Sequence, residues 1–379
     1  MKNLLLFGLF YFLSQYGYAQ TFTCQSSPDG TIWCDDFEDG IPLAQKYFEY
    51  DSNKGDCIVM DGVGRDGSKG IRVRWQAGEV SAGGIKKSFG RTPDNYIGKY
   101  SVFPNSSFNE IYWRMDVRHQ IGWQGGGPAK LMRALTLANS NWATGAMAHL
   151  WSGGKDNVYL GMDPASGVTV DGTLKTTKYN DFDNLRWLGF KSGNIDMFSD
   201  ENAGRWFCVE GHVRLNTPGE NDGIFEFWIN DTLQAGSYNL NWHGSWNADP
   251  NNMKINAIFF ENYWNQGSPV EQERYFDNIV ISTKRITCDC GQSAVDGNNI
   301  SEIAVIYPNP ASDYIEISKP SQGFEPSGVT NIQIFNFLGE LVMEVEKIPS
   351  FVQRIDVSDL SAGVYFIQFD SQRIKFIKL

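Results

Sequence analysis

The stretch WFCVEGHVRLNTPGENDGIFEFWIND, residues 206–231, predicts two β-strands joined by a polar turn. Along its first half apolar and polar side chains alternate, which is the period of a strand with one buried face. The residues expected on the core side are Phe207, Val209, Val213 and Leu215. The residues expected on the opposite side are Glu210, His212 and Arg214. The turn PGENDG separates this strand from the apolar run that follows, so the pattern favours a half-buried sheet.

Four further runs have strand composition, because they are rich in aromatic and β-branched residues and are separated by Gly, Asn and Pro clusters. These runs are residues 110–119, 146–151, 254–264 and 273–282. No long stretch shows the period of a helix. We therefore predict an all-β fold, in which residues 20–286 form a two-sheet jelly roll.

The first 19 residues are typical of a secretory signal peptide, with a basic start and an apolar core too short to span a bilayer. The mature chain is expected to begin at Gln20 and to be exported. Its six cysteines favour disulfide bonds over metal thiolates in an exported protein. Cys288 and Cys290 stand too close together for an easy mutual bridge, so each is expected to pair with an earlier cysteine. The net charge of −12 argues against a nucleic-acid partner.

A composition change marks a domain boundary, because all 12 Trp and all four His precede residue 265. We predict a linker at residues 287–302 and a small β-sandwich at residues 303–379, where short strand-like runs alternate with turn signals. The motifs YPNP, IQIFNFLGE, LSAGVYFIQF and RIKFIKL resemble the C-terminal sorting domain of the type IX secretion system of Bacteroidetes. The resemblance implies that this domain engages the secretion machinery. It also implies transit through the periplasm to a secreted or surface-attached product.

Several outward side chains of the predicted strands would suit a polysaccharide. Sugars present C–H faces to aromatic rings and hydroxyls to charged groups. The residues expected to bind it are Tyr112, Arg118, Trp151, His212, Arg214, Trp242 and Trp246. The last two belong to NLNWHGSW, which would form an aromatic platform. A solvated outer face is the alternative interpretation of these strands.

The segment GWQGGGPAKLMRALTL, residues 122–137, places Lys130 between a glycine run and a strand-like run. A phosphate-binding loop would require Gly-Lys-Ser or Gly-Lys-Thr, so this segment does not match one. The glycines are expected to turn the backbone at the edge of a sheet. Lys130 is then expected to enter a groove at the start of the next strand and to meet an anionic sugar.

The stretch 205–231, together with FFENYWNQGSPVEQERYFDNIVIS at 259–282, resembles concanavalin A-like jelly rolls. Within that group it resembles polysaccharide lyases of the family 14 type, over most of residues 100–286. The resemblance implies that Lys130 is the catalytic lysine, because the family's lysine follows the glycines of its loop. The chain departs from the family pattern at Glu261-Asn262, where the family commonly has glycines, and by an insertion before Lys130.

A polyuronate lyase removes the C5 proton of a uronic acid and expels the 4-linked sugar. It therefore requires a group that neutralises the carboxylate, a base and an acid. The candidates are Arg114 or Arg118 for neutralisation, Lys130 or His149 as the base, and Tyr159 or Tyr112 as the acid. We predict a secreted, monomeric polysaccharide lyase that acts on an anionic glycan and needs no cofactor.

Two other functions remain open. A non-catalytic carbohydrate-binding or cell-surface protein could use the same aromatic face. A retaining glycoside hydrolase requires two carboxylates about 5–5.5 Å apart, but Glu220, Asp222 and Glu226 do not match the strand spacing that jelly-roll glucanases use. Asp61 and Asp66 share a Gly-rich loop that could hold a structural calcium ion, although its spacing is not that of an EF-hand.

Overall fold

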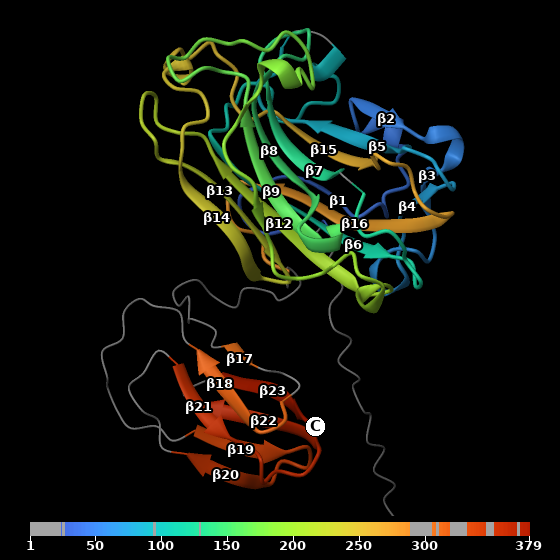
Figure 1. Ribbon diagram of the computed structural model, residues 1–379, viewed down its shortest axis with the longest axis vertical. Coiled ribbons are helices and arrows are strands. Elements are labelled where there is room, and N and C mark those ends of the chain that lie inside the picture. Colours follow the sequence, from blue (N-terminus) through green and yellow to red (C-terminus); the bar gives the residue numbers. More distant parts are fainter. Residues whose placement is uncertain are drawn as a thin grey trace, which may run out of the picture. The chain divides into compact units, whose positions relative to one another are not determined.

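The computed structural model divides the chain into two compact units, residues 1–293 and 294–379 (Figure 1). The residues it describes are 24, 27–93, 96–128, 130–288, 305–307, 311–318, 332–345, 352–369 and 372–379. The predicted signal peptide and Cys290 lie outside these residues. In the part of the chain that the structure describes, no helix has the length and apolar character needed to cross a membrane.

The first unit contains two large antiparallel sheets, of which sheet A has eight strands. These are β1 (Thr31–Asp35), β3 (Cys57–Met60), β4 (Gly70–Trp75), β6 (Glu110–His119), β12 (Trp206–Arg214), β13 (Gly223–Ile229), β14 (Thr232–Leu240) and β16 (Gln272–Ser282). Their order is β14-β13-β12-β6-β16-β4-β3, with β1 also paired to β16. The predicted turn PGENDG joins β12 to β13, which lie side by side.

Sheet B has the other eight strands of this unit. These are β2 (Glu49–Asp51), β5 (Ser81–Ser88), β7 (Lys130–Leu137), β8 (Thr144–Gly153), β9 (Tyr159–Ser166), β10 (Arg186–Trp187), β11 (Lys191–Ser192) and β15 (Ala257–Tyr263). Their order is β10-β9-β8-β7-β15-β5-β2, with β11 also paired to β9. Strands far apart in the sequence, such as β7 and β15, therefore become neighbours.

The helical segments of the described residues are short 3-10 turns in the loops. They are η2 (Leu43–Gln45), η3 (Asn53–Gly55), η4 (Arg65–Gly67), η5 (Tyr96–Gly98), η6 (Lys155–Asn157), η7 (Phe182–Asn184), η8 (Asp200–Asn202) and η9 (Trp246–Ala248). The all-β prediction is confirmed, because two sheets of antiparallel strands make up the body of this unit.

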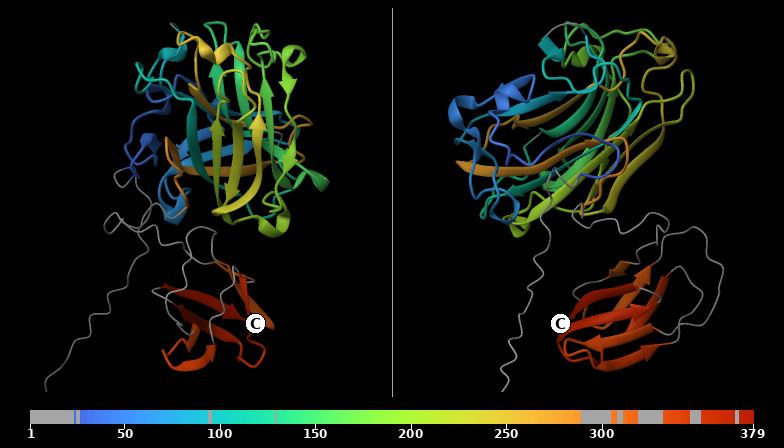
Figure 2. Two further views of the ribbon diagram at one scale, coloured as in Figure 1. Left: turned by 90° about the vertical axis from the view of Figure 1, so that its left-hand side faces the viewer. Right: turned by 180° about the vertical axis from the view of Figure 1, so that it is seen from behind.

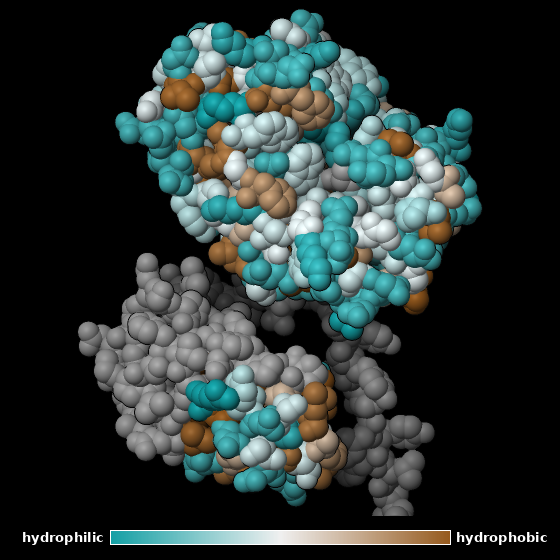
Figure 3. Space-filling view, viewed as in Figure 1, coloured by the Kyte–Doolittle hydropathy of each residue, from teal (hydrophilic) through white to brown (hydrophobic). Residues whose placement is uncertain are grey.

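The two sheets lie face to face around one apolar core (Figure 2). The alternation that predicted the inner face of β12 is confirmed, since Val209 and Val213 are buried among core residues of both sheets. Gly211 continues this inner face, and the Trp113 ring occupies the space that a larger side chain would fill. Exposed apolar side chains on the visible face of this unit are scattered among hydrophilic ones (Figure 3).

A second apolar cluster covers part of the outer face of sheet B. It contains Leu135, Leu137, Met147 and Phe259 from the strands, with Phe48 and Ile97 from the loops over them. Tyr179 and Trp142 pack against its edge. The loops thus cover one half of this face and leave the other half, where β7 begins, for a groove.

Two disulfide bonds join described residues of the first unit. Cys24 is bonded to Cys34, and Cys208 in β12 is bonded to Cys288 just beyond β16. The expectation that Cys288 pairs with an earlier cysteine is therefore met. Cys57 is buried and has no disulfide partner among the described residues, and burial raises the pKa of its thiol to about 12.

The described residues of the second unit form two small antiparallel sheets with orders β17-β18-β21 and β20-β19-β22-β23. Their strands are β17 (Val305–Tyr307), β18 (Tyr314–Ser318), β19 (Ile332–Asn336), β20 (Leu341–Val345), β21 (Val352–Asp356), β22 (Gly363–Phe369) and β23 (Gln372–Lys378). A separate apolar core that includes Ile315, Ile334, Ile367 and Phe376 joins them. This arrangement is the small β-sandwich that the turn spacing predicted.

Candidate functional site

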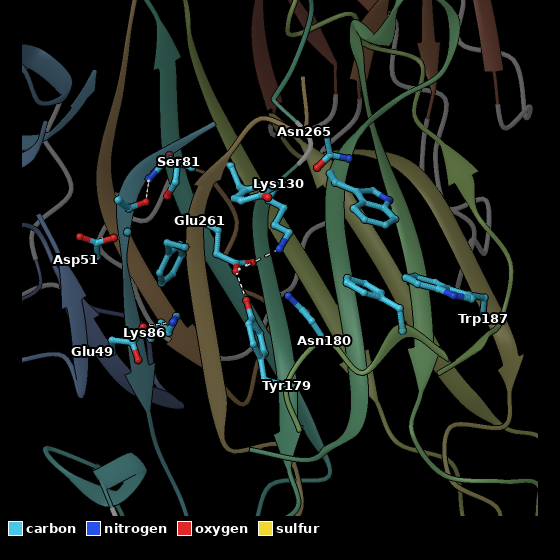
Figure 4. A pocket seen from close by; sticks show the side chains of 17 residues that line it. Glu49, Asp51, Ser81, Lys86, Lys130, Tyr179, Asn180, Trp187, Glu261 and Asn265 are labelled. Carbon is cyan, nitrogen blue, oxygen red and sulfur yellow. Dashed lines mark hydrogen bonds and ion pairs between the residues drawn. The ribbon is translucent and has the colours of Figure 1, made fainter. Parts of the chain in front are cut away.

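A groove of about 610 Å³ crosses the outer face of sheet B (Figure 4). It reaches from β10 at one side of the sheet to β2 at the other, so it runs across the strands. The side chains of its polar and aromatic lining are Glu49, Asp51, Ser81, Lys86, Lys130, Trp151, Tyr179, Asn180, Phe182, Trp187, Phe260, Glu261, Asn262, Tyr263 and Asn265. The covered half of the sheet supplies one wall, through Tyr179 and Phe182.

Lys130 stands in the middle of this groove as the first residue of β7. Its side chain is 11% exposed, and its Nζ lies 3.9 Å from Oε1 of Glu261 and 4.8 Å from the centroid of the Tyr263 ring. The preceding glycines shape its approach, since Gly125 and Gly126 have φ values of 85° and 70°. A side chain at Gly126 would also strike the backbone of Asp156 and Asn157. The lysine therefore follows a tightly packed turn.

A β-bulge in β15 faces Lys130. The register between β15 and β7 shifts between Phe260 and Tyr263, so that Tyr263 pairs with Lys130. On the other side of β15, Gly83 has a φ of 87° and approaches the backbone of Asp51. Bulges re-aim side chains, and here Glu261 reaches the groove beside Lys130 (Figure 4). Tyr263 also lines the groove.

Glu261 is the centre of a buried polar network. Arg133 Nη2 and the Tyr179 hydroxyl each donate to Glu261 Oε1, both at 2.7 Å. Arg133 also donates to the Tyr179 hydroxyl oxygen. Burial alone would raise the pKa of Glu261, but the charges of Arg133 and Lys130 and these hydrogen bonds outweigh it, so the pKa is lowered. Glu261 is therefore ionised, and the Tyr179 hydroxyl is engaged on both sides.

The ammonium of Lys130 has a lowered pKa. Burial is the largest cause, and the charges of Arg133 and Lys86 act in the same direction, while Glu261 opposes them. A lysine in this setting loses its proton more readily than a lysine in water. The groove thus holds an amine that is poised to exchange a proton.

Asn180 offers a hydrogen-bond donor beside Lys130. Its Oδ1 accepts from Arg133 Nη1 at 2.8 Å. Because the oxygen faces Arg133, the amide NH2 group is the end that meets the Tyr179 hydroxyl and faces the groove (Figure 4). Arg133 therefore fixes the direction of Asn180 without facing the groove itself.

Aromatic rings form one end of the groove. Trp151 and Trp187 are stacked at 5.8 Å with an interplanar angle of 17°, and Phe182 continues the series at 6.4 Å and 9° from Trp187. Trp187 and Phe182 are exposed by 41% and 50%. Their faces are available to the C–H face of a sugar ring.

His149 lies on β8 opposite Arg133. It is buried, does not line the groove, and neither of its ring nitrogens has a hydrogen-bond partner among the described residues. Burial, with the charges of Arg133 and Lys130, holds the pKa of its imidazole well below the usual range. Its ring centroid lies 4.1 Å from that of Trp151, so His149 supports this ring instead of presenting a base.

The structure does not bring the predicted residues of β6 and β12 to this groove. Tyr112, Arg114, Arg118, His212 and Arg214 belong to sheet A, and the apolar core separates them from Lys130. Arg114 is buried against Asp116. His212 is stacked on Tyr112 at 4.1 Å and lies 2.8 Å from both Glu110 and Glu226.

Three further predicted residues also lie away from the groove lining. Trp242 is wholly buried and its Nε1 donates to the Arg214 carbonyl at 2.9 Å, so the expected aromatic platform is wrong for this ring. Trp246 begins η9 in a loop, and Tyr159 begins β9 beside Gly154. Of the predicted site residues, the groove gathers Lys130 and Trp151.

The Gly-rich loop that contains the calcium candidates Asp61 and Asp66 includes the 3-10 turn η4 (Arg65–Gly67). Asp61 lies 4.0 Å from Lys69 Nζ. Within the described residues, no group of three or more His, Cys, Asp or Glu side chains is placed to hold a metal ion.

The sequence profile of one family, described as "Secretion system C-terminal sorting domain", matches residues 305–378. This match confirms the predicted sorting domain and indicates export, to a secreted or surface-attached location. No curated protein matches the sequence.

Among solved structures, the chain is similar to an endo-β-1,4-glucuronan lyase from the fungus Trichoderma reesei. The identity is 12% and the TM-score 0.47, over 69% of this chain and 100% of that chain. It is also similar to a marine PL-14 alginate lyase from Aplysia kurodai, with 14% identity and a TM-score of 0.44, over 67% and 99%. An alginate lyase from Chlorella virus matches with 16% identity and a TM-score of 0.41, over 60% and 89%. These neighbours are of the kind that the sequence resemblance named, and the likeness concerns the fold.

Proposed function

We propose that the first unit is a polysaccharide lyase that cleaves a uronate-containing glycan by β-elimination. One observation carries the proposal: a nearly buried lysine with a lowered pKa stands in the middle of a long groove whose rings suit sugars. The sorting domain at residues 305–378 exports the enzyme to its polymer, after transit through the periplasm.

Lys130 is the base of this proposed reaction. Its neutral amine takes the proton from C5 of the uronic acid, and the C–H electron pair forms the double bond between C4 and C5. The bond from C4 to the glycosidic oxygen then breaks, and that oxygen takes up a proton. Burial favours the neutral amine before the reaction, which is the state that a general base needs.

Asn180 stabilises the charge that develops on the substrate carboxylate when C5 loses its proton. Its NH2 group donates a hydrogen bond to that carboxylate, and Arg133 holds the amide in this direction. Arg133 itself is wholly buried and bonded to Glu261, so it positions other groups and does not contact the sugar.

Tyr263 supplies the proton to the leaving oxygen. Its ring lies 4.8 Å from Lys130 Nζ and its side chain is 39% exposed, so its hydroxyl can meet a bound sugar. Tyr179 is less suited to this role, because its hydroxyl donates to Glu261 and accepts from Arg133. Tyr263 therefore takes the place that the sequence assigned to Tyr159 or Tyr112.

A binding-only protein is the second candidate, and Glu261 favours it. This carboxylate sits 3.9 Å from Lys130 Nζ, where it competes with a substrate carboxylate for the same cation. In that case the aromatic rings and amides bind the glycan and no bond breaks.

Incubation with alginate, glucuronan and a neutral β-glucan separates these functions. A lyase produces ultraviolet-absorbing unsaturated ends from a uronate polymer, and the Lys130→Ala variant does not. A hydrolase produces reducing ends without this absorbance. If the wild-type protein binds a uronate polymer and yields neither kind of end, the binding-only role replaces the proposed one.

A further inference from the structure

The two ends of the groove differ in chemistry. On one side of Lys130 the lining is aromatic, with Trp151, Trp187 and Phe182. On the other side, β2 and β5 contribute Glu49, Asp51 and Lys86 (Figure 4). Six strand spacings of roughly 4.8 Å separate β10 from β2, so the groove extends for roughly 29 Å and contacts several sugar rings at once.

The lining carries more carboxylates than cations. Its charged side chains are the carboxylates of Glu49, Asp51 and Glu261 and the ammonium groups of Lys86 and Lys130. Lys86 is paired with Glu49, and Lys130 lies against Glu261. Among the described residues Asp51 has no ion-pair partner. It is exposed and accepts a hydrogen bond from the Asn53 backbone N–H at 2.9 Å.

A homopolyuronate fits this distribution poorly. Every ring of such a polymer carries a carboxylate, so a chain that places one uronate at Lys130 brings others to Asp51 and Glu49. The carboxylates of the polymer and those of Asp51 and Glu49 repel one another, and this repulsion opposes the binding of a homopolyuronate. A neutral sugar at the same place instead donates hydroxyl hydrogen bonds to those carboxylates.

The aromatic end has the same preference. The exposed surfaces of Trp187 and Phe182 are apolar and carry no cation, so they suit the C–H face of an uncharged ring. A carboxylate on a sugar at this end finds no charge partner in the lining. Lys130 and the Asn180 amide remain at the centre of the groove, with the aromatic rings on one side and an excess of carboxylates on the other.

We propose that the groove selects a glycan in which uronic acids alternate with neutral sugars, with one uronate at Lys130 and a neutral sugar on each side. This proposal rests on the proposed function and names its substrate class. Glu49 and Asp51 are the specificity-determining residues, since they repel a further uronate of the same chain where the groove reaches β2.

Calorimetric binding of two oligosaccharides of equal length to the full chain tests the proposal. One probe is an oligoglucuronate, and the other is a hyaluronan oligosaccharide, in which each glucuronate is followed by a neutral amino sugar. At low ionic strength we expect the alternating probe to bind at least about tenfold more tightly, as the repulsion of a misplaced charge requires. Equal or tighter binding of the oligoglucuronate, or no binding of either probe, overturns the proposal.

The double variant Glu49→Gln/Asp51→Asn identifies the residues responsible. It should gain affinity mainly for the oligoglucuronate, so that the ratio of the two affinities falls toward one. The matched control is Glu220→Gln/Asp200→Asn, which removes the same two charges at exposed positions outside the groove lining and should keep the ratio. Asp51→Asn alone, which breaks no ion pair, should shift the ratio in the same direction. A ratio that stays constant in all three variants removes the two residues from specificity.

Unsaturated ends are also measured on glucuronan and on hyaluronan. This measurement tests the lyase reaction independently of the proposed specificity. Preferred binding of the alternating probe without unsaturated ends supports the specificity and refutes the lyase. Cleavage together with preferred binding of the homopolymer supports the lyase and refutes the specificity.

Discussion

Nζ of Lys130 lies 3.9 Å from Oε1 of Glu261, where the β-bulge of β15 faces the start of β7. The lysine is the proposed base, and the carboxylate is the anion that opposes its loss of a proton. Glu261 is held by Arg133 and Tyr179 at 2.7 Å each, so its position does not depend on Lys130. Lys130 can therefore be replaced while Glu261 keeps its hydrogen bonds to Arg133 and Tyr179.

Replacement of Lys130 by alanine should lower kcat on the cleaved polymer by about a thousandfold, because general-base catalysis by one side chain contributes an effect of this order. The melting temperature should change little, since Arg133 continues to neutralise Glu261. Lys130→Arg should not restore the activity, because a guanidinium keeps its proton near neutral pH. Both variants are measured by the rate of appearance of unsaturated ends. Substantial activity in Lys130→Arg would show that the residue acts as a fixed charge.

Replacement of Glu261 by glutamine should shift the pH profile of kcat. The Glu261 charge raises the pKa of Lys130, so its removal lowers that pKa, and the neutral amine persists to lower pH. The acid limb should therefore move to lower pH. Tyr179→Phe, which keeps both charges, should move it much less. A shift of the acid limb to higher pH in Glu261→Gln contradicts the assignment of Lys130 as the base.

The same substitution should destabilise the first unit. Glu261→Gln leaves the buried Arg133 without its anion, and loss of one partner from a buried pair costs about 3 kcal/mol. Glu49→Gln, which removes a less buried carboxylate from its pair with Lys86, should cost less than about 1 kcal/mol. Denaturant unfolding of the two variants compares these values directly.

The sequence predicted the jelly roll because alternation along residues 206–214 reflects local geometry, which the folded chain keeps. It did not predict which strands share a sheet. The partners β7 and β15 lie more than one hundred residues apart in the chain, and no local pattern records their pairing. For this reason the sequence pattern places Arg114 and His212 with Lys130, although the core separates the two sheets.

The residues that the sequence analysis missed belong to the irregular parts of the site. Tyr179 and Asn180 lie in a loop without periodicity, and Trp187 lies in a two-residue strand. The sequence distinguished Glu261 only because the resembling family commonly has glycine at this position. That departure was the one signal in the sequence that pointed to Glu261. It places a carboxylate at the bulge over the groove, where the resembling family commonly has glycine.

Replacement of Trp187 by alanine should weaken substrate binding about fivefold and leave kcat nearly unchanged. The stacked series from Trp151 to Phe182 loses its middle ring, and such ring contacts contribute about 1 kcal/mol each. The effect belongs in KM, because the ring lies at one end of the groove and away from Lys130. Trp246→Ala, a change of the same size outside the groove lining, is the control. Equal effects of the two variants would mean that the aromatic end does not bind the glycan.

Asp277 should make the stability of the first unit fall as the pH rises from acid to neutral. Burial is the main cause that raises the pKa of this carboxyl from 3.8 to about 7, and the neighbouring Asp116 adds to it. Below its pKa in the unfolded chain, the carboxyl is protonated in both the folded and the unfolded state, so its contribution to the free energy of unfolding is complete there. As the pH rises toward 7, the unfolded chain releases the proton more readily than the folded chain, and the contribution is lost.

The variant Asp277→Asn isolates this effect, since it removes the titration while an oxygen remains to accept from the Arg65 backbone N–H, which donates to Asp277 Oδ2 at 2.7 Å in the wild type. Denaturant unfolding at pH 4 and pH 8 should show that the wild type loses about 4 kcal/mol more than the variant, because one pKa unit corresponds to about 1.4 kcal/mol. Asp61→Asn, at an exposed carboxylate, should follow the wild type. Parallel pH curves for the wild type and Asp277→Asn would mean that Asp277 is ionised throughout, held by the cations around Asp116.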